Sequence, residues 1–239
     1  IAALVAVSGS AMGQTIIADG FGDGDRDNDG VAEGAVTDAS DVGAAWYLGA
    51  GVSDVTVSVV DDAAGIGGGN ALDFVSMTDF TRPLIANIAP VPLANDGINF
   101  KLTIRLTETP IDPTDGGLFP SRNGDRRIRM GLYNSNGTPI VGDTPDPDPI
   151  LMIPEITDDD TGYLMVVDAV PSAGNTLSVF GDQADGILGG SAVSLGGTDA
   201  NPAWQIGNAP VTLELILTRS GDDVLVAAVF DGQLAEDGV

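Results

Sequence analysis

Residues 211–230, VTLELILTRSGDDVLVAAVF, contain two apolar runs separated by a short polar turn. In the first run every second residue is apolar, which places Val211, Leu213, Leu215 and Leu217 on one face. The second run, 224–230, follows the turn RSGDD at 219–223. A period of two is typical of a strand with one buried and one solvated face. The stretch therefore predicts a β-hairpin in an antiparallel sheet.

The same alternation recurs along the chain. It is present in DVTVSVV at 54–60, INFKLTIRL at 98–106 and RIRMGLY at 127–133. Helical spacing of apolar residues is nearly absent after the first 14 residues. Roughly ten to fourteen short strands joined by Gly, Asp and Pro turns predict an all-β fold, a two-sheet antiparallel β-sandwich.

The composition limits the class of partner. The 239 residues carry a net charge of −26, and 30 of the 35 acidic residues are Asp, which favours turns and binds hard cations. Nucleic acid and anionic membranes attract basic surfaces, so neither is an expected partner. Aromatic residues make up only 5% of the chain, so aliphatic side chains must fill the core.

Both ends of the sequence suggest a secreted fragment. Residues 1–13 resemble the apolar and small-residue parts of a signal peptide, although a buried first strand is the alternative. We expect a single β-sandwich domain over 14–239, located outside the cell or at its surface. No segment reaches the ~20 apolar residues of a transmembrane helix. After the turn Asp231-Gly232 the chain ends in a polar tail, so we expect the domain to lack a following strand.

The stretch FGDGDRDNDG, 21–30, places acidic residues at alternate positions. The spacing D-x-D-x-D-G matches the first half of a calcium loop, in which positions 1, 3 and 5 face one centre. Val36 occupies the place of the bidentate Glu, so this is not an EF-hand. The predicted Ca²⁺ ligands are Asp23, Asp25, Asp27, Asp29, the carbonyl of Val31, and Glu33. The alternative is a solvated acidic turn without metal.

Several stretches together carry a resemblance to a known family: FGDGDRDNDG, DDAAGIGGGNALDF (61–74), INFKLTIRLT, RRIRMGLYNSNGT (126–138), TGYLMVV and the hairpin at 211–230. They resemble the concanavalin A-like lectin/glucanase superfamily, in particular LamG-like jelly rolls of secreted planctomycete and verrucomicrobial proteins. The resemblance implies a curved two-sheet jelly roll. It also implies glycan binding in some members and glycan hydrolysis in others.

The acidic residues do not have the spacing of a glycosidase. Retaining glycosidases hold two carboxyl groups ~5 Å apart, and glucanases of this fold carry them on one strand. The glutamates here lie far apart, at Glu33, Glu108, Glu155, Glu214 and Glu236. The absence of His also excludes a Ser-His-Asp triad. We therefore expect no enzymatic activity; a hydrolase or lyase without the usual glutamate motif is the remote alternative.

Glycan binding needs aromatic platforms and planar polar groups. The candidate ligand-binding residues are Trp46, Tyr47, Arg126, Arg127, Tyr133, Asn134, Asn136 and Trp204. Three kinds of these residues have a structural alternative: packing for the tryptophans, a tight turn for the asparagines, and ion pairs for the arginines. The sequence thus favours a secreted, calcium-stabilised module that binds an extracellular polysaccharide without cleaving it. The rival is a matrix, surface-layer or filament subunit that self-associates through sheet edges.

Overall fold

The computed structural model of the chain describes residues 19–34, 43–48, 55–62, 66, 69–76, 84–93, 97–105, 127–137, 139–143, 160–168, 177–182, 193–197, 206 and 209–238. The predicted signal peptide, 1–13, lies outside these residues, as do residues 106–126 and 144–159. Over the described residues the secondary structure is β throughout, without a helix. Consequently, none of these residues belongs to a helix capable of crossing a membrane.

The described residues form twelve strands, which agrees with the expected number. They are β1 (Trp46–Leu48), β2 (Val55–Asp61), β3 (Asn70–Ser76), β4 (Leu84–Ala86), β5 (Ile98–Ile104), β6 (Arg127–Asn134), β7 (Thr161–Asp168), β8 (Leu177–Asp182), β9 (Val193–Gly197), β10 (Val211–Ser220), β11 (Asp223–Phe230) and β12 (Gln233–Gly238).

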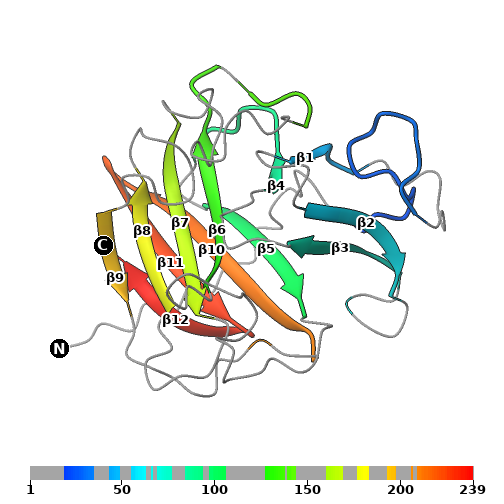
Figure 1. Cartoon of the computed structure of the whole chain (residues 1–239). Helices are drawn as coiled ribbons and strands as arrows, with labels where there is room; N and C mark the ends of the chain where they lie inside the picture. Colours follow the sequence, from blue (N-terminus) through cyan, green and yellow to red (C-terminus); the bar gives the residue numbers. More distant parts are fainter. Residues whose placement is uncertain are drawn as a thin grey trace.

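Two four-stranded sheets make up most of the fold. Their strand orders are β12-β11-β10-β5 and β6-β7-β8-β9, and all of these neighbours are antiparallel. Figure 1 shows one sheet in front of the other, with the β2–β3 hairpin to one side. The short strands β1 and β4 form a further antiparallel pair. The predicted all-β class with antiparallel sheets is confirmed, whereas the concanavalin A-like jelly-roll connection stays a prediction.

A single apolar core joins the two large sheets. The β12-β11-β10-β5 sheet contributes Leu213, Leu215, Leu217, Val226, Ala228 and Phe230, and the β6-β7-β8-β9 sheet contributes Met130, Met165, Val167, Leu177 and Val179. The four predicted inward residues of β10 all lie in or against this core. Since burying one such aliphatic side chain stabilises a fold by about 1.5–3 kcal/mol, this shared core holds the sheets together.

The hairpin predicted at 211–230 forms as expected. Leu213 pairs with Phe230 and Ser220 with Asp223, so only Gly221 and Asp222 remain for the turn. Gly221 has φ +67°, and Asp222 is not in the left-handed region. This is the pattern of a type II′ turn, whose twist matches that of the flanking strands.

The prediction for the C-terminal tail was wrong. Residues 233–238 form β12, which pairs with β11 along the edge of the sheet. The connection is the two-residue turn Asp231-Gly232, with φ values of +48° and +77° as a type I′ turn requires. An edge strand tolerates polar side chains because it is solvated, and this explains why the sequence of the tail does not resemble a strand.

Candidate functional sites

The acidic loop at 21–34 is closed by its own backbone. The Gly24 N–H donates to the carbonyl of Phe21 (3.2 Å), and the Glu33 N–H donates to the carbonyl of Gly24 (2.8 Å). Gly30 takes φ +87° in a place where an added Cβ would meet no atom within 4 Å. The backbone turn, and not lack of space, therefore requires glycine there.

The same loop is attached to three strands. Gly34 forms a parallel bridge with Val59 of β2, and a Cβ at Gly34 would come within 1.9 Å of the Val59 carbonyl oxygen. The Asn70 side chain of β3 donates to the Phe21 carbonyl (2.7 Å). The Trp46 N–H of β1 donates to the Arg26 carbonyl (2.8 Å). The acidic loop thus has a position fixed by the neighbouring strands.

Three aspartates of this loop converge. Each of Asp25, Asp27 and Asp29 offers a carboxylate oxygen, and these oxygens lie within 4.8 Å of one another. Oxygens bound to one Ca²⁺ at about 2.3–2.6 Å cannot lie much more than about 5 Å apart, so this spacing fits a shared calcium ion. The Gly30 N–H donates to Asp25 (2.8 Å) and the Val31 N–H to Asp29 (2.7 Å), which orients two of the carboxylates.

Two oxygens of this acidic cluster are buried without a hydrogen bond. They are Oδ1 of Asp25 and Oδ1 of Asp27, for which the described part of the chain supplies no donor. Burying such a group unpaired is costly, since it loses its water. Burial likewise raises the pKa of Asp27; the charge of Arg26 opposes this, and the charges of Asp29 and Asp143 add to it. A bound cation would supply the missing partner.

Arg26 is the charged centre of the acidic loop. It is only 6% exposed, and its guanidinium makes a two-point contact with Asp143: Nη1 to Oδ1 at 3.0 Å and Nη2 to Oδ2 at 2.9 Å. It also contacts Asp27 at 3.4 Å and donates to the Trp46 carbonyl. Burial disfavours the charge of Arg26, yet the hydrogen bond and charge of Asp143 leave its pKa raised.

Glu33, a predicted calcium ligand, bonds instead to Arg26. Its Oε2 accepts from the Arg26 backbone N–H (2.6 Å) and its Oε1 from Nε (3.2 Å). Burial raises the pKa of Glu33, which the bonds and charge of Arg26 partly offset. Asp23 accepts from the Asp25 N–H (3.2 Å), and Val31 is 64% exposed. The three converging oxygens thus come from Asp25, Asp27 and Asp29 among the six predicted ligands.

Trp46 and Tyr47 lie on β1, next to the acidic loop. The indole N–H of Trp46 donates to Oδ2 of Asp19 (2.8 Å), which also accepts from the Ala44 N–H (3.1 Å). Both aromatic residues are partly buried, and Tyr47 pairs with Ile85 of β4. The hydrogen bond of Trp46 to Asp19 favours the packing interpretation over an exposed sugar platform.

Tyr133 also has structural contacts. Its hydroxyl donates to Oδ2 of the buried Asp182 (2.8 Å). Its ring lies against two glycines, since a Cβ added at Gly131 or Gly162 would come within 2.4 or 2.7 Å of ring atoms. An aromatic ring over strand glycines replaces the side-chain packing that the glycines lack.

Asn134, the last residue of β6, and Asn136 form the tight turn named as their alternative. The Asn136 N–H donates to the side chain of Asn134 (3.1 Å), and φ is +47° at Asn136 and +92° at Gly137. Arg127 begins β6, and its backbone lies opposite that of Asp168 in the strand register. Arg126 and Trp204 lie outside the described residues.

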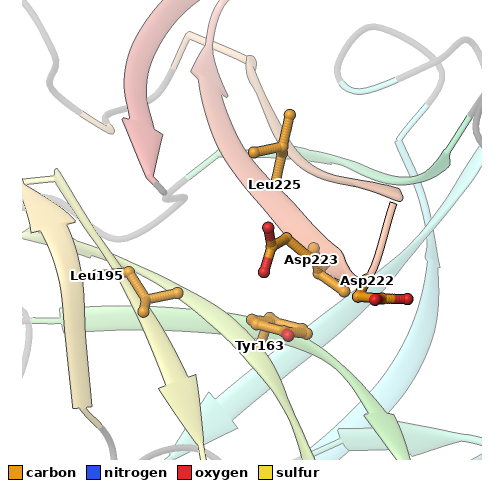
Figure 2. Close-up of a pocket in the computed structure, with 6 residues that line it drawn as sticks. Tyr163, Leu195, Asp222, Asp223 and Leu225 are labelled. Atoms are coloured by element: carbon orange, nitrogen blue, oxygen red, sulfur yellow. The ribbon is translucent and has the colours of Figure 1, made fainter. Parts of the chain in front are cut away.

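A hollow of about 420 Å³ lies between the two large sheets and the β10–β11 turn (Figure 2). Its lining residues are Tyr163, Leu195, Asp222, Asp223, Val224 and Leu225. Figure 2 shows the Tyr163 ring between Leu195 and Asp222, with Asp223 above it. The glycan-binding residues predicted from the sequence include none of these. Packing of the sheets, and not a local sequence pattern, brings Tyr163 close to the hairpin.

No family model, curated protein or solved structure matches this chain. The resemblance to concanavalin A-like domains therefore stays a prediction, and its functional implications enter below as proposals.

Proposed function

We propose that this chain is a secreted, non-catalytic carbohydrate-binding or attachment module whose N-terminal loop binds calcium. One observation carries the calcium part: carboxylate oxygens of Asp25, Asp27 and Asp29 lie within 4.8 Å of one another. Two buried oxygens of this group have no hydrogen-bond donor among the described residues. Oxygen-only ligands at this spacing suit a hard cation, and Ca²⁺ accepts their irregular geometry.

The attachments of the acidic loop support a structural role for the proposed calcium ion. Backbone and side-chain bonds join this loop to β1, β2 and β3. Arg26 pairs with Asp27, Glu33 and Asp143, while Asp25 and Asp29 have no cationic partner among the described residues. Calcium would neutralise this remaining charge and hold the loop against the strands.

The proposed fold is a concanavalin A-like β-sandwich. Two antiparallel sheets with a common core support this proposal, together with the sequence resemblance. The acidic composition suits a saline or calcium-containing exterior, where counter-ions screen the repulsion between like charges.

The non-catalytic part of the proposal rests on how the glutamates are used. Glu33 bonds to Arg26, and Glu214 accepts from Asn99 (2.7 Å) and pairs with Lys101 (3.1 Å). A glycosidase needs a pair of carboxyl groups that both face the scissile bond. Glu33 and Glu214 instead hold neighbouring side chains of the fold, which supports a non-catalytic role.

A binding panel tests this proposal. The full chain is passed over immobilised neutral, amino-sugar and anionic polysaccharides in millimolar Ca²⁺ and again in chelator. We expect retention on one polymer class and weaker retention in chelator. Absence of retention on every polymer in both conditions would overturn the glycan-binding part.

One observation favours self-association as a second candidate. Leu225 and Leu234 are 40% and 63% exposed, and they belong to β11 and to β12, the terminal strand of its described sheet. Exposed apolar residues near a sheet edge favour strand pairing between molecules. Sedimentation velocity over a range of concentrations tests this. A dimer that Leu234→Ser reduces would support assembly, whereas a monomer at all concentrations would exclude it.

A further inference from the structure

We infer that the hollow beside the β10–β11 turn binds a protonated amino sugar, so that the glycan taken by the module contains unacetylated hexosamine. This inference rests on the proposed glycan-binding function and names the class of its ligand. The inference is based on a hollow of about 420 Å³ that is lined by one aromatic ring, two leucines and two adjacent aspartates. Pockets for small ligands have about this size and this mixture of apolar and polar groups.

The apolar side of the hollow suits a sugar ring. Tyr163 is partly buried against the core and presents its ring to the hollow (Figure 2). Leu195 and Leu225 add aliphatic surface, and Leu225 is 40% exposed. The C–H face of a pyranose packs on such a ring, while its hydroxyl groups stay at the polar rim.

The charged side of the hollow selects a cation. Asp222 and Asp223 are exposed and adjacent in sequence. The lining residues include no lysine or arginine. Arg219, in the same hairpin, donates from Nε to the carbonyl of Gly221 (2.9 Å) and does not line the hollow. An ammonium group in the hollow would donate to the carboxylate of Asp223 in an ion pair and make a cation–π contact with Tyr163.

The same charges disfavour uronic and sulfated polymers. Two carboxylates at the rim and a net charge of −26 would repel an anionic chain. Among sugars, an unacetylated hexosamine combines the apolar ring face with a single ammonium group. A neutral sugar would leave the carboxylates without a charged partner.

Two matched ligands and two matched variants test the inference. The ligands are glucosamine oligomers and N-acetylglucosamine oligomers of equal length, which differ in the ammonium group. The variants are Asp223→Asn, at the hollow, and Asp231→Asn, at the β11–β12 turn outside it. Each variant removes one exposed charge, and Asn readily takes the positive φ of position 231. Titrations are run at fixed calcium and salt.

We expect the glucosamine oligomer to bind about tenfold more tightly than its acetylated counterpart, as a charge-assisted hydrogen bond implies. Asp223→Asn should weaken that binding about tenfold, and Asp231→Asn should leave it within about twofold. Equal weakening by both variants would indicate attraction to the whole acidic surface and would overturn the inference.

Two further results separate this inference from the proposed function. Retention of a neutral or anionic glycan that Asp223→Asn leaves unchanged would overturn the inference and keep the proposed function. Absence of any glycan retention would overturn both. Oligolysine of matched charge serves as a peptide probe. If it binds as tightly as the glucosamine oligomer and with the same response to Asp223→Asn, the hollow recognises ammonium groups in general and the assignment to a sugar is wrong.

Discussion

Arg26 and Asp143 form a two-point ion pair across 117 residues of sequence, with N···O distances of 3.0 and 2.9 Å. The Arg26 side chain is 7% exposed and that of Asp143 is 32% exposed. Oδ1 of Asp143 also accepts from the Leu48 N–H of β1 (2.8 Å). One carboxylate therefore connects the acidic loop with a neighbouring strand.

Replacing Arg26 should destabilise the protein strongly. Arg26→Met keeps much of the aliphatic volume but leaves Asp27, Glu33 and Asp143 without their cation. Removing one partner of a buried ion pair costs about 3–5 kcal/mol. Because Asp143 is partly exposed, we expect a loss of about 3 kcal/mol. Urea unfolding gives this quantity. Arg219→Met, at an exposed arginine, is the control and should change stability by less than about 0.5 kcal/mol. An equal effect of both substitutions would contradict the role of Arg26.

The ion pair between Arg105 and Asp62 should make the stability of the fold depend on pH in the acidic range. Asp62 accepts from Nε of Arg105 (3.1 Å) and from the Ile66 N–H (3.1 Å). The hydrogen bond from Arg105 lowers the pKa of Asp62 below its ordinary 3.8. A carboxylate with a lowered folded pKa stabilises the fold above its unfolded pKa, and this contribution disappears as the pH falls through the folded pKa.

The measurement is urea unfolding of the wild type and Asp62→Asn from neutral pH to about pH 3. We expect the wild type to be more stable at neutral pH, with a difference that decreases below about pH 4. The other carboxylates titrate in both proteins, so their effect cancels in the difference between the two free energies of unfolding. A difference that stays constant over this range would show that the charge of Asp62 does not matter.

Tyr133 should contribute to stability and not to glycan binding. Tyr133→Phe keeps the ring over Gly131 and Gly162 but removes the hydroxyl that donates to Asp182, which is 2% exposed. We expect a loss of about 1–2 kcal/mol, since a buried charged acceptor loses one of its donors. Polysaccharide retention should not change. If the variant lost polysaccharide retention while its stability stayed unchanged, Tyr133 would have to be part of the glycan-binding site.

Local patterns in the sequence predicted the hairpin but not its neighbour at the edge. Alternation at 211–217 and the short turn after it were sufficient, because both strands bury one face in the same core. The same pattern does not predict the strand after Phe230, because Gln233, Glu236 and Asp237 do not alternate with apolar residues. The dipeptide Asp231-Gly232 was the available signal, because Asp-Gly favours a two-residue hairpin turn.

In the candidate sites, too, local features could be predicted from the sequence and contacts between distant segments could not. The spacing of Asp25, Asp27 and Asp29 is local, so the sequence predicted their convergence directly. The partners of Arg26 and the contact of Tyr163 with the β10–β11 turn depend on packing between distant segments. Alternation of apolar and polar residues predicts which face of a strand is buried, but it does not predict which segment covers that face. Position 9 of the calcium motif indicates Glu33 as a ligand, but the motif does not predict that Glu33 accepts hydrogen bonds from Arg26.

Calcium titration by calorimetry tests the central claim most directly. The full chain, Asp27→Asn and the control Asp231→Asn are compared at fixed ionic strength, after circular dichroism has verified that each is folded. We predict one saturable site with a dissociation constant of about 10⁻⁵ to 10⁻³ M in the wild type and the control, and its loss in Asp27→Asn. A wild type without saturable calcium binding, or an Asp27→Asn protein that binds like the control, would contradict the account.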